Sequence, residues 1–341
     1  MRTRILILGM IAVVASQAVR GNAQQTPVGS TPTTSAAPIV TLSDLEPAPA
    51  ATNPAPTVSG STFDSSCQSC EPGFGLRRWL RPSERCFDNF ISPISNPVFF
   101  EDPRNLTEAR FIFLNHRVPD AAGGEDVQLF ALQLRASLTD NVSLIVTKDG
   151  YITSSNPLVD DGWADLAAGL KFNLLRNVES QGLLSTGFTF AAPTGTEGAL
   201  QGRGDGELNV FLSGAQQLGN RNYFMSTSGF RLPMDGDAGS DVWYWSNHLS
   251  RQVTDRFYLL TEFNWYHWMG SGTNGVPGVE GLDLFNLGST GVSGNDIVTQ
   301  AVGVKFKRNC HREIGLAYEF PLTERKDIIE DRVNFNWIFR Y

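Results

Sequence analysis

The chain has 341 residues, of which 18% are charged, and its formal net charge is −8. This acidic balance argues against nucleic acid as a partner, because nucleic-acid-binding domains present clustered basic residues. No internal apolar run reaches the roughly 20 residues that a membrane helix needs, which disfavours a helical membrane protein but not a transmembrane β-barrel, whose strands are apolar on one face only.

Residues 1–23 have the pattern of a cleaved export signal. Arg2 and Arg4 precede an apolar core of about ten residues from Ile5 to Val14, which is too short to anchor the chain in a bilayer as a helix. Gly21-Asn22-Ala23 is an acceptable cleavage site, and Ser16-Gln17-Ala18 is a competitor. We predict cleavage after Ala23; a buried N-terminal helix is the alternative.

Two segments of different composition follow the predicted signal peptide. Residues 24–64 are rich in Pro, Thr, Ser and Ala. They can bury too little apolar surface to offset the entropy of ordering, so we predict a disordered periplasmic linker. In residues 65–107, prolines interrupt a series of large apolar side chains: Trp79, Phe87, Phe90, Phe99 and Phe100. This pattern predicts a short, irregular but ordered extension, which either plugs a barrel lumen or covers its periplasmic mouth.

The four cysteines are Cys67, Cys70, Cys86 and Cys310. Export places them in an oxidising compartment, where structural disulfides are the simplest interpretation. The C-x-x-C pair lacks the further ligands of a zinc site and the βαβ context of a redox motif, so no metal or cofactor is predicted. Cys310 falls in a turn predicted to be periplasmic, on the same side as the extension. We therefore predict Cys86–Cys310 with Cys67–Cys70 as a local pair, which is one of three possible connectivities.

From residue 108 onward the apolar pattern has period two, which is typical of β-strands. In the last run Val333, Phe335 and Trp337 face one way, and Asn334 and Asn336 face the other. Large apolar side chains opposite polar ones suit a strand between lipid and water. Such runs begin near residues 108, 126, 142, 162, 182, 206, 223, 241, 257, 296, 312 and 331. They predict an all-β fold, an antiparallel up-and-down transmembrane β-barrel of about twelve strands over residues 108–341.

The connections between these runs alternate in length. Short turns lie at residues 139–141, 177–181, 218–222, 254–255 and 309–311, and longer loops at 118–125, 152–161, 192–205, 233–240, 270–295 and 321–330. Outer-membrane barrels alternate in this way, with short periplasmic turns and long outer loops. We therefore predict the outer membrane as the location, with a periplasmic C-terminus.

Aromatic residues mark the chain end and two strands. Trp337, Phe339 and Tyr341 resemble the C-terminal signal that the barrel-assembly machinery reads, so this machinery and outer-membrane lipids are the expected partners. The runs 243–245 and 265–268 suit aromatic girdles at the membrane interfaces. The sequence does not specify an oligomeric state.

Several short motifs resemble a family of outer-membrane barrels known as the "MetA-pathway of phenol degradation" or putative transporter family. They are Ser185-Thr-Gly-Phe-Thr-Phe-Ala-Ala-Pro-Thr-Gly195, Gly202-Arg-Gly-Asp-Gly206 and Gln217-Leu-Gly-Asn220, with Ser92–Pro97 and Phe100–Arg104 as a similar lead-in. The resemblance covers about residues 160–341. It implies a barrel that transports hydrophobic compounds or other small solutes, and it carries no catalytic residue.

The face predicted to line the lumen carries charges of both signs: Arg110, Arg135, Asp165, Lys171, Glu262, Lys305, Glu319 and Arg340. A charge on the lipid face would cost about 2–4 kcal/mol near the membrane midplane, so these side chains belong inside. They either form a polar network that fills a narrow barrel or line a water-filled pore.

These observations predict a pore or transporter for small solutes. A structural barrel whose extension tethers the cell envelope is the first alternative. A lipid hydrolase using His248 with Ser246 or Ser250 is the second, and it is disfavoured because the chain has no G-x-S-x-G elbow and these serines are poorly placed to contact the histidine. We expect no enzymatic activity.

Overall fold

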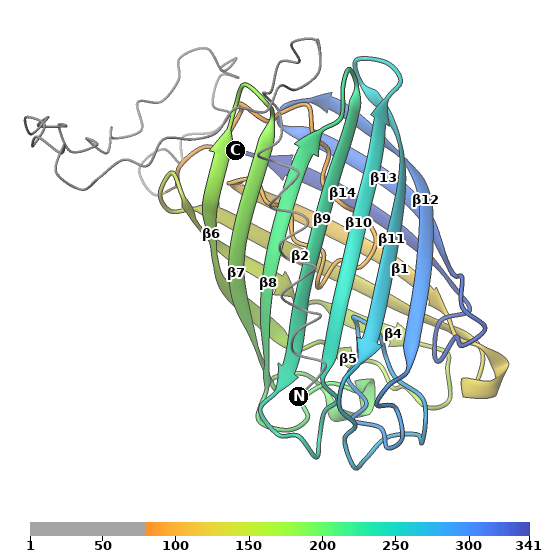
Figure 1. Cartoon of the computed structure of the whole chain (residues 1–341). Coiled ribbons are helices and arrows are strands. Elements are labelled where there is room, and N and C mark those ends of the chain that lie inside the picture. The colour runs from red at the N-terminus through yellow and green to blue at the C-terminus, as the bar shows by residue number, and fades with distance from the viewer. Residues whose placement is uncertain (1–79) are drawn as a thin grey trace, which may run out of the picture. The chain divides into compact units, whose positions relative to one another are not determined.

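The computed structural model describes residues 80–341 and shows a closed antiparallel β-barrel of twelve strands (Figure 1). Strand β1 pairs with β14 on one side and β2 on the other, which closes the sheet. The predicted signal peptide, the predicted linker and the first part of the extension, with Cys67 and Cys70, lie outside the described residues.

The strands follow one another around the barrel in chain order, apart from the neighbourhood of β3 to β6. Two short 3-10 helices, η1 (Asp120–Ala122) and η2 (Glu197–Ala199), lie in loops. The strands are β1 (Glu108–Arg117), β2 (Asp126–Ser137), β3 (Val142–Lys148), β4 (Tyr151–Ser154), β5 (Gly162–Trp163), β6 (Leu166–Asn177), β7 (Gly182–Ala192), β8 (Glu207–Gln217), β9 (Asn222–Pro233), β10 (Val242–Gln252), β11 (Phe257–Trp268), β12 (Asp296–Asn309), β13 (Arg312–Pro321) and β14 (Asp331–Arg340).

Fourteen strand segments make twelve barrel strands because two strands are interrupted. Segments β3 and β4 both pair with β2, and Asp149 and Gly150 interrupt the strand between them. Segments β5 and β6 are separated by Ala164 and Asp165, and pair with β4 and β3 respectively. The two interruptions are on neighbouring strands, so the regular hydrogen-bond ladder is broken at one place in the wall.

The predicted strand pattern is confirmed. The strands begin within one residue of the predicted positions, with the largest differences at β8, β9 and β10, which begin at residues 207, 222 and 242. One end of the barrel carries the short turns and the C-terminus, and we call it the short-turn end. The other carries the long connections and is called the long-loop end.

Side chains alternate between the two faces of the wall, as period two requires. Polar and charged residues such as Lys171, Glu262 and Lys305 face inward and are buried. The outward face is mostly apolar and exposed, and its members include Phe111, Phe130, Leu132, Leu134, Leu249, Leu259, Phe263, Val302, Val304, Ile314, Leu316, Tyr318 and Trp337. No helix within residues 80–341 is long and apolar enough to cross a membrane.

Candidate functional site

Residues 80–107, here called the inner segment, fold into the barrel from the short-turn end (Figure 1). Both ends of the inner segment lie beside the C-terminus, since the Ser83 N–H donates to the Tyr341 carbonyl at 2.6 Å and the Tyr341 N–H donates to that of Thr107 at 2.9 Å. Its apex reaches β10, where Phe99 stacks on Tyr244 with ring centroids 4.6 Å apart. The extension therefore enters the lumen rather than only covering its mouth.

Wall cations and inner-segment acids form buried ion pairs. Arg135 Nη2 lies 2.6 Å from Glu101 Oε2, and Lys171 Nζ lies 2.8 Å from Glu101 Oε1. Lys171 Nζ also donates to the carbonyl oxygens of Asp102 and Arg104, at 2.5 and 2.8 Å. The side chains of Arg135 and Lys171 are fully buried. One inner-segment carboxylate thus neutralises two wall cations.

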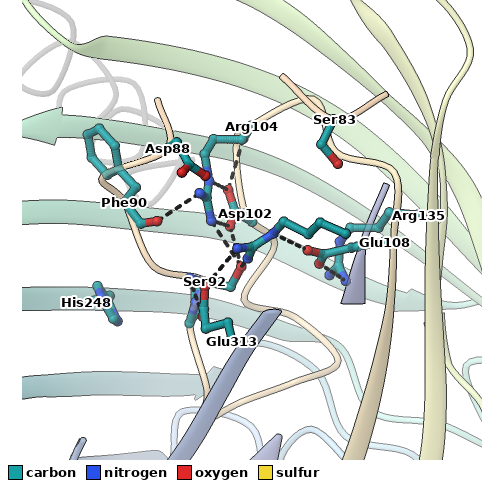
Figure 2. A network of polar contacts seen from close by, with 12 residues as sticks. Ser83, Asp88, Phe90, Ser92, Asp102, Arg104, Glu108, Arg135, His248 and Glu313 are labelled. Atoms are coloured by element: carbon teal, nitrogen blue, oxygen red, sulfur yellow. Dashed lines mark hydrogen bonds and ion pairs between the residues drawn. The ribbon is translucent and has the colours of Figure 1, made fainter. Parts of the chain in front are cut away.

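A second network surrounds Arg340, near the short-turn end. Its guanidinium contacts Glu108 at 2.8 Å and Glu313 at 2.9 Å, and donates to Ser92 Oγ at 2.7 Å. Lys305 Nζ pairs with Glu313 at 2.7 Å. The network continues into the inner segment, where Figure 2 shows Arg104 contacting Asp102 and the main chain of Phe90.

Glu262 holds the main chain of the inner segment. It accepts the N–H groups of Ile94 at 2.9 Å and Ser95 at 2.6 Å, and its Oε1 lies 2.6 Å from His248 Nδ1. Within the described residues the other ring nitrogen of His248 and the Ser250 hydroxyl have no hydrogen-bond partner, whereas Ser246 accepts from Asn96 at 2.8 Å. The histidine and its neighbours thus serve the packed interior, and among residues 80–341 no serine hydroxyl is hydrogen-bonded to His248.

The remaining candidate charges have separate positions. Glu319 lies inside, where it accepts from Thr299 at 2.7 Å and lies 3.7 Å from Arg332. Arg110 is buried, and its nearest carboxylate, that of Glu108, is 3.7 Å away. Asp165 is not part of the lumen network. It lies at the long-loop end, accepts two loop N–H groups, at 2.9 Å each, and is 3.6 Å from a lysine on β3.

A long loop closes the interior from the other end. Residues 270–295 fold inward, and their apolar side chains Leu282, Leu284, Phe285 and Leu287 are buried. Arg231 joins this loop to the inner segment: it donates to the carbonyl oxygens of Leu282 and Phe285, at 3.0 Å each, and its guanidinium lies 5.6 Å from the centroid of the Phe99 ring. The lumen axis is therefore filled from both ends.

Two expectations about this interior need correction or extension. The aromatic runs are expected as interfacial girdles, yet Tyr244, Tyr266 and Trp268 face inward and are fully buried, while Trp243 and Trp265 face outward and pack edge to face with ring centroids 5.0 Å apart. The sequence prediction also missed partners of the wall charges, namely Glu101, Asp102, Arg104, Glu108, Asp283, Glu313 and Arg332. Strand alternation could have found those on the wall, but nothing local marks the inner-segment or loop members.

The hydrogen-bond ladder of the wall is interrupted where β3 and β4 separate. Gly150 has a backbone φ of 109°, and a Cβ atom there would lie 2.4 Å from the Phe130 carbonyl oxygen. Asp149 Oδ1 accepts the Leu132 N–H at 3.0 Å, so a side chain replaces the missing strand partner. Glycine is needed here because its neighbour's main chain approaches closely and φ is positive.

A groove with a volume of about 700 Å³ lies over this break on the outward face. Its lining is mostly large and apolar, and includes Phe111, Phe113, Phe130, Leu132, Trp163, Leu166 and Phe335. Behind the wall is a cavity of about 20 Å³, lined partly by Val98 of the inner segment and Phe285 of the long loop. Four residues line both the groove and the cavity: Ile112, Ala131, Asp149 and Ala164.

The predicted pairing of Cys86 with Cys310 and of Cys67 with Cys70 stays a prediction. Gln181 Nε2 donates to the Cys86 carbonyl at 3.0 Å and Arg85 Nη1 donates to that of Cys310 at 2.8 Å, which places both cysteines at the short-turn end. Nearby, burial raises the pKa of Glu84 above its ordinary range, and a hydrogen bond from Arg176 opposes the shift. The described residues contain no group of three or more His, Cys, Asp or Glu side chains arranged to hold a metal ion.

No protein-family model and no curated protein matches the chain. Among solved structures, an outer membrane channel from Pseudomonas putida F1 is 15% identical with a TM-score of 0.49, and covers 74% of this chain and 100% of its own. The NanC porin is 6% identical with a TM-score of 0.46, covering 69% and 100%. The KdgM porin is 8% identical with a TM-score of 0.42, covering 69% and 99%. These neighbours are outer-membrane barrels, and membership of the MetA-pathway family stays a prediction.

Proposed function

We propose that this protein is an outer-membrane barrel that passes small apolar molecules through its side wall, while its lumen axis stays closed. The groove and cavity on either side of Ile112, Ala131, Asp149 and Ala164 carry this proposal. Apolar linings favour apolar ligands, because burial of apolar surface supplies most of the binding free energy.

Membrane placement is supported by the distribution of side chains over the wall. The exposed outward face is apolar over most of the strand length, and the charged side chains in the middle of the strands face inward. Each charge would cost about 2–4 kcal/mol on the lipid side. The groove lies beside Phe111 of β1 and Phe335 of β14, both near the middle of their strands, and so at the depth of the hydrocarbon core.

The closed axis argues against free diffusion of ions or sugars. Lys171, Arg135 and Arg340 are saturated by the inner segment and the wall, so they do not face an aqueous path. An apolar molecule has another route. The cavity behind the wall touches Phe285 of the long loop and Val98 of the inner segment, and movement of these apolar groups would join it to the long-loop end without breaking the ion pairs.

The test is uptake of an apolar fluorescent probe, N-phenylnaphthylamine, by cells that produce the full chain. Ala131→Leu with Ala164→Leu fills the thin wall and should reduce uptake to the level of cells without the protein. Ala136→Leu is the matched control, because it lies on β2 outside both the groove and the cavity. Heat-modifiable migration on a gel checks that each variant is folded. Unchanged uptake by the folded double variant would reject the wall route.

A structural barrel is the second candidate, and the packed polar interior favours it. A network in which charges satisfy one another stabilises and specifies a fold without any transport. In that case cells with and without the wild-type protein should take up the probe equally, and no variant should change the rate.

A further inference from the structure

Four exposed arginines lie close together on the short-turn end, and we call them the arginine patch: Arg251, Arg256, Arg308 and Arg312. Arg251 and Arg256 flank the turn between β10 and β11, and Arg308 and Arg312 flank the turn between β12 and β13. The two turns are adjacent, because β11 pairs with β12 and the Lys307 N–H donates to the Arg256 carbonyl at 2.8 Å.

Strand alternation puts Arg251, Arg308 and Arg312 on the outward face, and Arg256 lies in the turn directly before Phe257, which is 52% exposed. Leu249, two residues before Arg251, is 46% exposed, and Ile314, two residues after Arg312, is 39% exposed. Glu313, next to Arg312, is fully buried and faces the lumen. The patch therefore lies at the edge of the apolar outer face that borders the short-turn end. Long arginine stems can cover apolar surface there while the guanidinium groups reach water and headgroups.

The patch has no internal counter-charge among residues 80–341, where none of its arginines forms a salt bridge. The neighbouring acid, Asp255, is 94% exposed and lies 3.8 Å from Arg221 of the next turn. Two other basic residues at this end are paired, Arg81 with Asp140 at 2.5 Å and Arg176 with Glu84. Within residues 80–341 the rim of β10 to β13 therefore carries four exposed arginines without a salt bridge.

We propose that the arginine patch binds the phosphate groups of anionic phospholipids in the leaflet at the short-turn end. Guanidinium groups match phosphate oxygens with paired hydrogen bonds, and a basic cluster at a membrane surface attracts lipids that carry net negative charge. The inference rests on the membrane placement in the proposed function, but not on transport.

The experiment is native mass spectrometry of the purified full chain, in detergent containing equal amounts of phosphatidylglycerol and phosphatidylcholine. The wild-type protein should retain phosphatidylglycerol preferentially. Arg308→Gln with Arg312→Gln should weaken this retention about 25-fold, from about fivefold for each arginine near the surface. Arg308→Lys with Arg312→Lys keeps the charge and should retain most of the preference.

The matched control is Arg203→Gln with Lys326→Gln, which removes the same charge from the loops at the other end. Equal loss in the control and patch variants, or no wild-type preference for phosphatidylglycerol, would overturn the proposal. Probe uptake is measured separately on the patch variant and should be unchanged. A failed lipid preference with intact uptake therefore rejects this inference alone, whereas unchanged uptake by the folded wall variant rejects only the proposed function.

Discussion

The interior of the barrel and the break in its wall are stabilised by different interactions. In the lumen, charged groups from the inner segment and the wall saturate one another, as around Glu101 and Arg340. At the wall break, the ladder is replaced by one hydrogen bond from the Leu132 N–H to the Asp149 side chain, and Ile112, Ala131 and Ala164 line both the outer groove and the inner cavity. We therefore expect the interior of this barrel to be more stable than the break in its wall.

The largest expected effect comes from removing the shared counter-ion of the lumen. Glu101→Ala leaves Lys171 buried without a carboxylate and Arg135 with only Glu108, at 3.3 Å, so the free energy of unfolding should fall by about 3–5 kcal/mol. Urea unfolding followed by tryptophan fluorescence measures this loss. Asp140→Ala, which removes the partner of the exposed Arg81, should cost less than about 1 kcal/mol. Similar losses of unfolding free energy in both variants would show that the lumen network contributes no more to stability than an exposed ion pair.

A smaller effect is expected at the wall break. Gly150→Ala places a Cβ atom against the main chain of Phe130 in a strained backbone conformation, and should cost about 1–3 kcal/mol in the same unfolding experiment. Gly219→Ala is the control, because Gly219 also has a positive φ, of 65°, but nothing lies within 4 Å of its Cβ position. If the two variants lose equal stability, the close approach at the break contributes nothing and only the backbone strain remains.

The smallest effect is expected at the contact between the inner segment and the long loop. Arg231→Met removes two donors to the loop carbonyls of Leu282 and Phe285, but Nε and Nη2 of Arg231 have no partner among the described residues, which offsets part of the loss. Hydrogen exchange of residues 281–289 should become about tenfold faster. Arg117→Met, at an exposed ion pair with Asp331, should leave this loop protected. Unchanged exchange in Arg231→Met would show that contacts other than those of Arg231 hold the loop inside the barrel.

The strands, their faces and the inward position of most charges could be predicted from the amino-acid pattern. Period two is a property of the local backbone, so Trp337 and Asn336 reveal opposite faces without knowledge of any neighbour. The alternation of short and long connections likewise follows from one strand and the next. For the same reason the inward position of Arg135, Lys171 and Glu262 was predictable, although their partners were not.

The groups that fill the lumen and the position of the break in the wall could be seen only in the folded barrel. Ser92 and Arg340 are 248 positions apart, and no local pattern pairs them. Alternation puts Tyr244 inward and Trp243 outward, but only the folded barrel shows that Phe99 is the side chain that stacks on Tyr244. The break at Gly150 was indistinguishable in sequence from the start of a loop, because its shape depends on the main chain of a neighbouring strand. Local periodicity fixes which way a side chain points, whereas its partner depends on contacts between distant segments.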